Sequence, residues 1–247
     1  MAGKGGYTEV MNVNDPKIVS LREKVSAADE EFDMAVRFHE VWKPAAHDKD
    51  LHKRMGASYA TNAFFVVRAA LRREMLLALM RLWDKEAKAV RMDSIATTLR
   101  DKQVIDALAA DRAARIGLPE AEGQMRKELG QRADAAIALI DKYSKGSAQG
   151  AVRQKLQLLR NERLAHRQTD ATAVVGADPT AGEIESFYQD MSNLISLLLS
   201  LVKAVAYNPE DTGRVYRHHA RFFWAGARGE RTEGHPDYRA PSVAQNS

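Results

Sequence analysis

Residues 158–167 are LLRNERLAHR. This stretch continues an apolar pattern with steps of four and three residues, formed by Val152, Leu156 and Leu159. Its arginines keep a similar spacing, at positions 160, 163 and 167, so a helix would place them in one row. We therefore predict a helix over about residues 148–167 that buries its apolar face and ends in a cluster of cationic and polar side chains.

Helical periodicity extends in both directions from this stretch. Apolar residues recur at three- and four-residue steps from Ile18 to Val36, which predicts a helix that ends before Pro44. Further helices are predicted over about residues 51–88, 94–116 (one or two short helices), 119–143 and 182–206. Thr180 and Glu183 have the spacing of a capping box at the start of the last of these helices. No alternating run is long enough to predict a strand, so the fold class is all-α.

The two ends of the chain differ from this pattern. Residues 1–16 are expected to be a flexible lead-in, and residues 17–207 a single helical domain. Residues 208–247 contain several Gly and Pro and no sustained period, so we expect a partly disordered tail. Phe222, Phe223 and Trp224 are the residues that would dock it.

Composition excludes several classes of function. The chain of 247 residues has no cysteine, which rules out disulfides, thiolate zinc sites and cysteine nucleophiles. Its apolar run at residues 195–202 is far shorter than the roughly 20 residues that span a bilayer. No secretory signal is visible at the N-terminus, and we expect a cytoplasmic protein without a membrane partner. A net charge of +4 permits a nucleic-acid partner without requiring one.

The polar side chains of residues 160–167 can do chemistry together. An arginine can hold two phosphate oxygens through its planar fork, and a histidine titrates near neutral pH. Glu162 and His166 are four residues apart and could pair, which would raise the histidine pKa. Taken singly, each of these residues is typical of a solvated helix surface, so the functional interpretation depends on their coincidence.

The segment resembles the signature of the HEPN superfamily, in which an arginine and a polar residue precede a histidine by a short spacer. Here these are Arg160, Asn161 and His166, with the small Ala165 before the histidine. The chain further resembles the abortive-infection, AbiU-like branch of that superfamily. That likeness is carried by the long early helices, by residues 82–84 (LWD) and 93–95 (DSI), and by the apolar helix after the motif.

The resemblance implies a HEPN-like helical bundle that dimerises and cuts single-stranded RNA without metal or other cofactor, in a toxin or phage-defence setting. It implies catalytic roles for Arg160, Asn161 and His166, auxiliary phosphate binding by Arg163 and Arg167, and an orienting role for Glu162. An antitoxin or another defence protein is a further candidate partner. In related toxins a tyrosine two residues after the histidine is modified by the antitoxin. Gln168 occupies that position here, which speaks against that form of control.

The chemistry of cleavage favours a homodimer, and the helix geometry permits one. In-line cleavage needs a base for the 2′-hydroxyl and an acid for the leaving oxygen on opposite sides of the phosphorus, and one motif supplies one histidine. Positions 160 and 166 are about 120° apart on an ideal helix, so either the helix loosens or the two residues act across a dimer. A catalytically silent HEPN module that binds RNA or a protein, and a purely structural helical adaptor, remain the alternatives.

Overall fold

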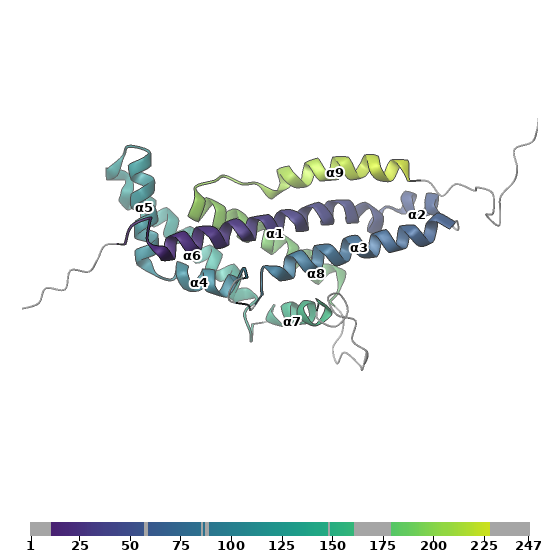
Figure 1. Ribbon diagram of the computed structural model, residues 1–247, viewed down its shortest axis with the longest axis horizontal. Coiled ribbons are helices and arrows are strands. Elements are labelled where there is room, and N and C mark those ends of the chain that lie inside the picture. The colour runs from purple at the N-terminus through teal and green to yellow at the C-terminus, as the bar shows by residue number, and fades with distance from the viewer. Residues whose placement is uncertain are drawn as a thin grey trace, which may run out of the picture. The chain divides into compact units, whose positions relative to one another are not determined.

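The computed structural model describes residues 11–56, 59–84, 86, 89–147, 149–160 and 179–227. These ranges are helical and contain no β-strand, which confirms the all-α prediction (Figure 1). The helices are α1 (Pro16–His47), α2 (Lys49–Met55), α3 (Tyr59–Arg81), α4 (Met92–Leu99), α5 (Lys102–Arg115), the 3₁₀ turn η1 (Pro119–Ala121), α6 (Glu122–Lys142), α7 (Gly150–Leu159), α8 (Ala181–Leu198), the π-helical segment η3 (Leu199–Lys203) and α9 (Pro209–Gly226). None of these helices is long and apolar enough to cross a membrane.

The chain forms two compact units. The first contains residues 1–33 and 77–209, and the second contains residues 34–76 and 210–247. Helices α1 and α3 each begin in one unit and end in the other. Each unit has its own buried residues and is described separately below.

The core of the first unit is built around α6. Its small and aliphatic residues face inward, so that α4, α5 and α8 all pack against it. The buried positions of α6 are Leu129, Ala133, Ala136 and Ile140. Helix α8 contributes a stripe in which Leu194 and Leu198 are fully buried, as the sequence predicted. Among the described helices, α8 packs mainly against α6, and Lys155 of α7 forms an ion pair with Glu183 of α8 at 2.9 Å.

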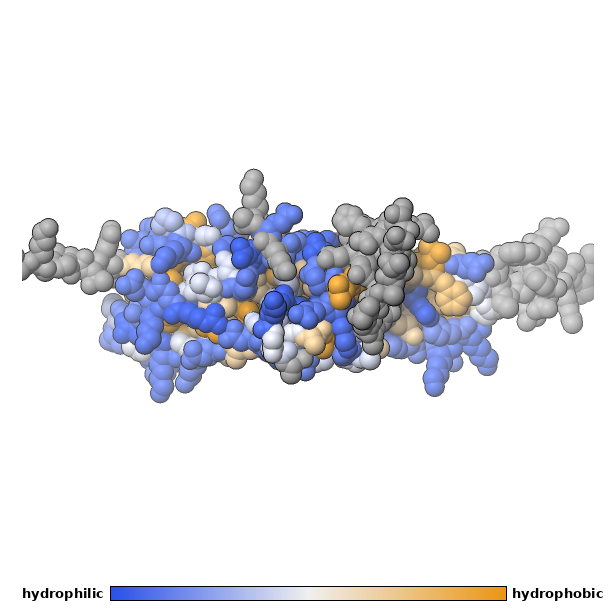
Figure 2. Space-filling model, turned by 90° about the horizontal axis from the view of Figure 1, so that it is seen from below, coloured by the Kyte–Doolittle hydropathy of each residue, from blue (hydrophilic) through white to orange (hydrophobic). Residues whose placement is uncertain are grey.

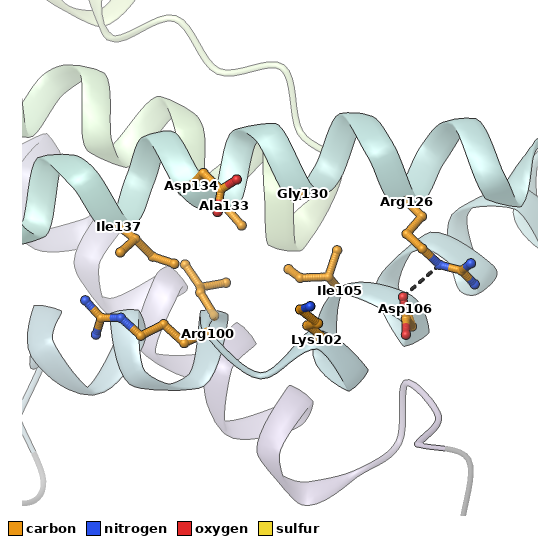
Figure 3. A pocket seen from close by; sticks show the side chains of 10 residues that line it. Arg100, Lys102, Ile105, Asp106, Arg126, Gly130, Ala133, Asp134 and Ile137 are labelled. Carbon is orange, nitrogen blue, oxygen red and sulfur yellow. Dashed lines mark ion pairs between the residues drawn. The ribbon is translucent and has the colours of Figure 1, made fainter.

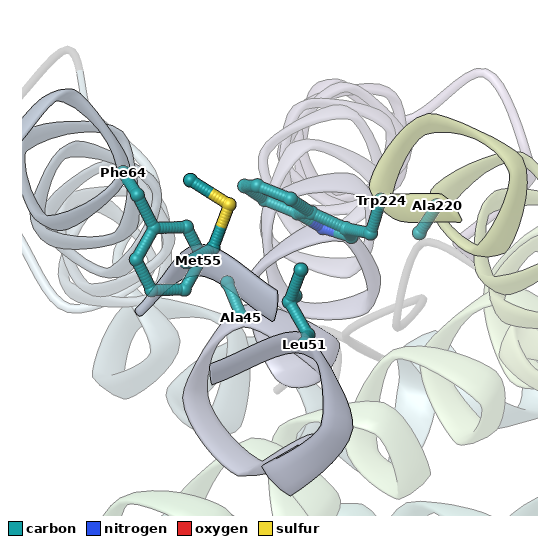
Figure 4. Packing of buried hydrophobic residues seen from close by; sticks show 6 residues of the cluster. All are labelled: Ala45, Leu51, Met55, Phe64, Ala220 and Trp224. Carbon is teal, nitrogen blue, oxygen red and sulfur yellow. The ribbon is translucent and has the colours of Figure 1, made fainter. Parts of the chain in front are cut away.

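The second unit has a smaller core, formed where α2, α3 and α9 meet the last part of α1. Its buried residues are Ala45, Leu51, Met55, Phe64, Ala220 and Trp224 (Figure 4). The Trp224 ring lies 5.6 Å from the Phe64 ring in an edge-on contact, and its Nε1 donates to the carbonyl of Val41 at 2.8 Å. Trp224 therefore docks α9 through both apolar contact and a satisfied indole N–H.

Three boundaries differ from the sequence-based expectation. Helix α1 continues through Pro44 to His47, because proline in a last turn removes a single intrahelical hydrogen bond. The predicted helix over 51–88 is divided at Gly56, whose φ of +46° suits glycine. The prediction of a tail without a helix after residue 208 is wrong for Pro209–Gly226, which form α9. Most of the predicted lead-in, and residues 228–247 of the predicted tail, lie outside the described residues.

Exposed aromatic side chains are concentrated in the second unit. The face seen in Figure 2 is mainly hydrophilic, with its apolar side chains in small separate groups. Among the described phenylalanines, the exposed ones are Phe65 of α3 and Phe222 and Phe223 of α9. Trp224 docks as the sequence predicted, whereas Phe222 and Phe223 face solvent. Such clustering marks a candidate interaction surface.

Candidate functional site

Arg160 begins the predicted motif and caps the C-terminal end of α7. Its backbone amide donates to the carbonyls of Leu156 and Gln157, which keeps the residue in helical conformation. Its guanidinium Nη2 donates to Oδ2 of Asp84 at 3.1 Å. Both side chains are 22% exposed, so the ion pair is half-buried and is weakly screened by solvent. Asp84 therefore fixes the Nη2 end of the Arg160 guanidinium.

The remaining motif residues are Asn161, Glu162, Arg163, His166 and Arg167, and they lie outside the described residues. Their distances from Arg160, the pairing of Glu162 with His166 and the row of arginines therefore stay predictions. Arg153 lies on α7 seven residues before Arg160, and because residues seven apart on a helix share a face, it falls near the predicted row.

Arg153 is held by an aromatic ring. Its guanidinium lies 5.1 Å from the centroid of the Trp83 indole ring, in a cation–π contact. Its Nε is buried and has no hydrogen-bond partner in the described part of the chain. Burial lowers the pKa of Arg153, and the charge of Asp93 acts in the opposite direction. The guanidinium stays charged at neutral pH, so α7 presents two arginines, each held by a residue of the Trp83–Asp84 turn.

A third arginine lies next to the same turn. Trp83 and Arg91 form an isolated antiparallel β-bridge, and Arg91 pairs with Asp93 at 3.2 Å. Burial alone would raise the pKa of the Asp93 carboxyl, but the hydrogen bond and charge of Arg91 lower it overall. The carboxylate is therefore ionised at neutral pH and offsets part of the local positive charge.

The turn rests on an aromatic cluster. The rings of Tyr143 and Phe187 are 4.9 Å apart and edge-on, and Trp83 lies 6.2 Å from Tyr143. The Tyr143 hydroxyl donates to Asp190 at 2.5 Å. Burial and this hydrogen bond raise the pKa of Tyr143, so its hydroxyl remains a donor. This packing makes the turn a rigid support for Arg153 and Arg160.

A separate groove lies between α4, α5 and α6, with a volume of about 550 Å³ (Figure 3). Its floor is apolar, with Ile105 and Ile137 among the lining residues. Arg126 at its rim is paired with Asp106 at 2.7 Å, and the groove contains no residue of the motif. The charged side chains of its lining include Arg100, which pairs with Asp141 at 2.7 Å, so we assign this groove no role in the proposed chemistry.

The sequence analysis identified Arg160, the first residue of the motif, but not the side chains that hold it. Residues 82–84 were noted only as part of a family likeness, and the sequence analysis assigned no role to Arg153. The structure brings Asp84 to Arg160 across a separation of 76 residues. The one sequence signal for this contact is an acidic residue, Asp84, directly after Trp83 near a predicted helix end. That signal does not identify which arginine pairs with Asp84.

An all-helical fold and the motif that begins at Arg160 define a member of the HEPN superfamily. Comparison with family models then gives the particular family, because the HEPN_AbiU2 (AbiU2) model matches residues 18–223. The chain therefore belongs to the AbiU2 abortive-infection family of HEPN proteins. The match extends from the start of α1 into α9. Searches of curated proteins and of solved structures gave no match.

Proposed function

We propose that this protein is an endoribonuclease that cuts single-stranded RNA through attack of the 2′-hydroxyl, as a toxin or phage-defence effector of abortive infection. The observation that carries the proposal is the placement of Arg160 at the end of α7. Its Nη2 donates to Asp84 at 3.1 Å, and a guanidinium carries five N–H donors, so it can hold phosphate oxygens through donors other than this one. Family membership supports the same function.

The proposed mechanism divides the work among the motif residues. His166 exchanges a proton with the 2′-hydroxyl or with the leaving 5′-oxygen, and Glu162 orients its ring. Arg160 stabilises the negative charge that builds on phosphorus, and Asn161 orients the phosphate or the histidine. Arg163 and Arg167 act as auxiliary phosphate ligands.

The mechanism requires two copies of the motif. The base and the acid act on opposite sides of the phosphorus, and each chain supplies one motif histidine. A two-fold homodimer brings the second histidine to the same phosphate. We therefore propose a homodimer with Arg160 and His166 near its axis, acting in the cytoplasm. An antitoxin or another defence protein would restrain it.

Product analysis tests the proposed reaction. Wild-type protein should cut single-stranded RNA in the presence of EDTA and leave a 2′,3′-cyclic phosphate on the upstream fragment. DNA of the same sequence should stay intact because it lacks the nucleophile. Arg160→Lys should cut poorly, since a point charge cannot replace the bidentate fork. Arg115→Gln, an exposed arginine on α5, is the matched control and should cut like wild type. Loss of activity in EDTA would overturn the metal-independent mechanism.

A second candidate function is a catalytically silent HEPN module that binds RNA or a partner protein. The observation in its favour is again the ion pair of Arg160 with Asp84, because a guanidinium already bound to a carboxylate must share its charge with phosphate. The cleavage assay distinguishes the endoribonuclease from the silent module. A silent module binds RNA without cutting it, and Arg160→Lys then changes affinity alone.

A further inference from the structure

Helix α9 exposes aromatic side chains that its own packing does not need. Gly213, Ala220 and Trp224 face the interior of the second unit. Phe222 and Phe223 are 69% and 61% exposed. Two neighbouring phenylalanines in solvent are unfavourable unless a ligand covers them, so this surface is a candidate binding site.

The exposed face of α9 combines these rings with cations. Arg214, His218 and Phe222 follow one another at four-residue steps, and Arg221 lies three residues after His218, so the four form one stripe, which we call the α9 stripe. All four side chains are exposed. The His218 ring lies 4.9 Å from the Phe222 ring in an edge-on contact. This contact supports the phenyl ring from the side and leaves it available for stacking.

The arginines of α9 differ in their ion-pair partners. Arg217 is bound to Glu40 and to Glu210 and therefore holds the helix in place. Arg221 forms no ion pair within the described ranges of the chain, and it directly precedes Phe222. Arg214 pairs with Asp211 at 2.8 Å, but its side chain is 74% exposed. A phosphate could readily replace so exposed a partner.

The positive net charge of the chain comes from the second unit. Residues 34–76 and 210–247 contain 14 lysines and arginines against nine acidic residues, a net charge of +5. The rest of the chain, which includes the motif, contains 23 against 24, a net charge of −1. Long-range attraction of a polyanion must therefore come from the second unit.

We infer that the α9 stripe binds single-stranded RNA, with a base stacked on Phe222 and phosphates on Arg221 and Arg214. The inference rests on the proposed function, because that function makes single-stranded RNA the ligand. Aromatic platforms beside cations are how proteins hold single strands without reading their sequence. An apolar partner surface would leave Arg221 unpaired, so the charge favours a nucleic acid over a protein.

Binding can be measured without cleavage. The probe is a fluorescein-labelled oligothymidylate of about 12 nucleotides, which stacks and carries phosphates but has no 2′-hydroxyl. Phe222→Ala should weaken binding roughly 5- to 150-fold and leave the salt dependence unchanged. Arg214→Gln/Arg221→Gln should lower the slope of log affinity against log salt by about 1.4. Leu118→Ala and Arg115→Gln, exposed residues of the first unit, should bind like wild type.

The inference fails if wild type does not bind the probe, or if Phe222→Ala binds it as tightly as Leu118→Ala does. It also fails if Phe222→Ala changes only the oligomeric state, since the stripe would then contact a second copy. Cleavage of RNA is scored separately. A protein that binds through α9 but never cuts RNA disproves the proposed function alone, and one that cuts RNA with no dependence on Phe222 disproves this inference alone.

Discussion

Arg217→Ala tests how α9 is held in the second unit. Arg217 donates to both oxygens of the Glu40 carboxylate, from Nε at 2.8 Å and from Nη2 at 3.3 Å. The Glu40 side chain is 5% exposed, whereas that of Arg217 is 44% exposed. Among the residues that the structure describes, this carboxylate has one further hydrogen-bond contact, with His39 Nδ1 at 3.3 Å. The substitution therefore removes the main cation that faces a buried negative charge.

The expected loss of stability follows from the difference in exposure between Glu40 and Arg217. Breaking a fully buried ion pair from one side costs about 3–5 kcal/mol. The vacated space at Arg217 opens to solvent, which can hydrate part of the carboxylate. We therefore expect the free energy of unfolding to fall by about 2 kcal/mol. Arg214→Ala is the matched control on the same helix. Its pair with Asp211 is exposed on both sides and should contribute no more than about 0.5 kcal/mol.

The effect should depend on pH with a definite sign. Burial raises the pKa of Glu40, but the hydrogen bonds and charges of His39 and Arg217 outweigh it and lower that pKa overall. A lowered pKa stabilises the folded state above the ordinary glutamate pKa of about 4.3. That stabilisation disappears as the pH falls through the folded-state pKa. The difference between wild type and Arg217→Ala should thus be largest near neutral pH and shrink in acid.

Urea unfolding followed by tryptophan fluorescence measures this, because Trp224 reports on the docking of α9. Adding Glu40→Gln to Arg217→Ala should recover part of the lost stability, since the buried charge is removed as well. The reasoning is refuted if Arg217→Ala is no less stable than Arg214→Ala at neutral pH. A difference that grows in acid would refute it equally.

Three further substitutions test the site and the frame of the first unit. Asp84→Ala should lower kcat for RNA up to about 30-fold, because Arg160 regains up to about 2 kcal/mol of side-chain entropy, while the free energy of unfolding falls by about 1–2 kcal/mol because the half-buried guanidinium loses its carboxylate partner. Unchanged or faster cleavage would mean that Asp84 does not position Arg160. Ala204→Gly should raise the free energy of unfolding by about 0.5–1 kcal/mol, since Ala204 has a φ of +57°, and a lower melting temperature would contradict this. Thr180→Ala should cost about 1 kcal/mol in urea unfolding, because it removes the observed capping box with Glu183; no loss would show that the cap contributes little.

The helical frame of the chain is largely predictable because its signals are local. The capping box at Thr180 forms as its spacing predicts. Pro119 lies in the first turn of η1, directly before α6. Leu194 and Leu198 are buried, as their spacing requires. In each case residues within one or two turns decide the outcome.

Predictions fail where the deciding contact is distant or the buried face is small. The buried residues of α9 include Gly213, Ala220 and Trp224, and Gly213 and Ala220 give almost no hydrophobic signal. Pro44 predicts a helix end, but α1 continues to His47 because a proline in the last turn removes a single intrahelical hydrogen bond. The pairing of Asp84 with Arg160 depends on tertiary packing and cannot be found from spacing.

The central claim is that the motif beginning at Arg160 cuts RNA, and the most direct test replaces its histidine. Wild type and His166→Ala should be assayed side by side on the same single-stranded RNA in EDTA, with Arg115→Gln as the control. The account predicts a loss of roughly 10²–10⁴-fold in rate for His166→Ala, with the helical circular dichroism signal and the melting temperature unchanged. Cleavage by His166→Ala at the wild-type rate would contradict it and assign the activity to another site.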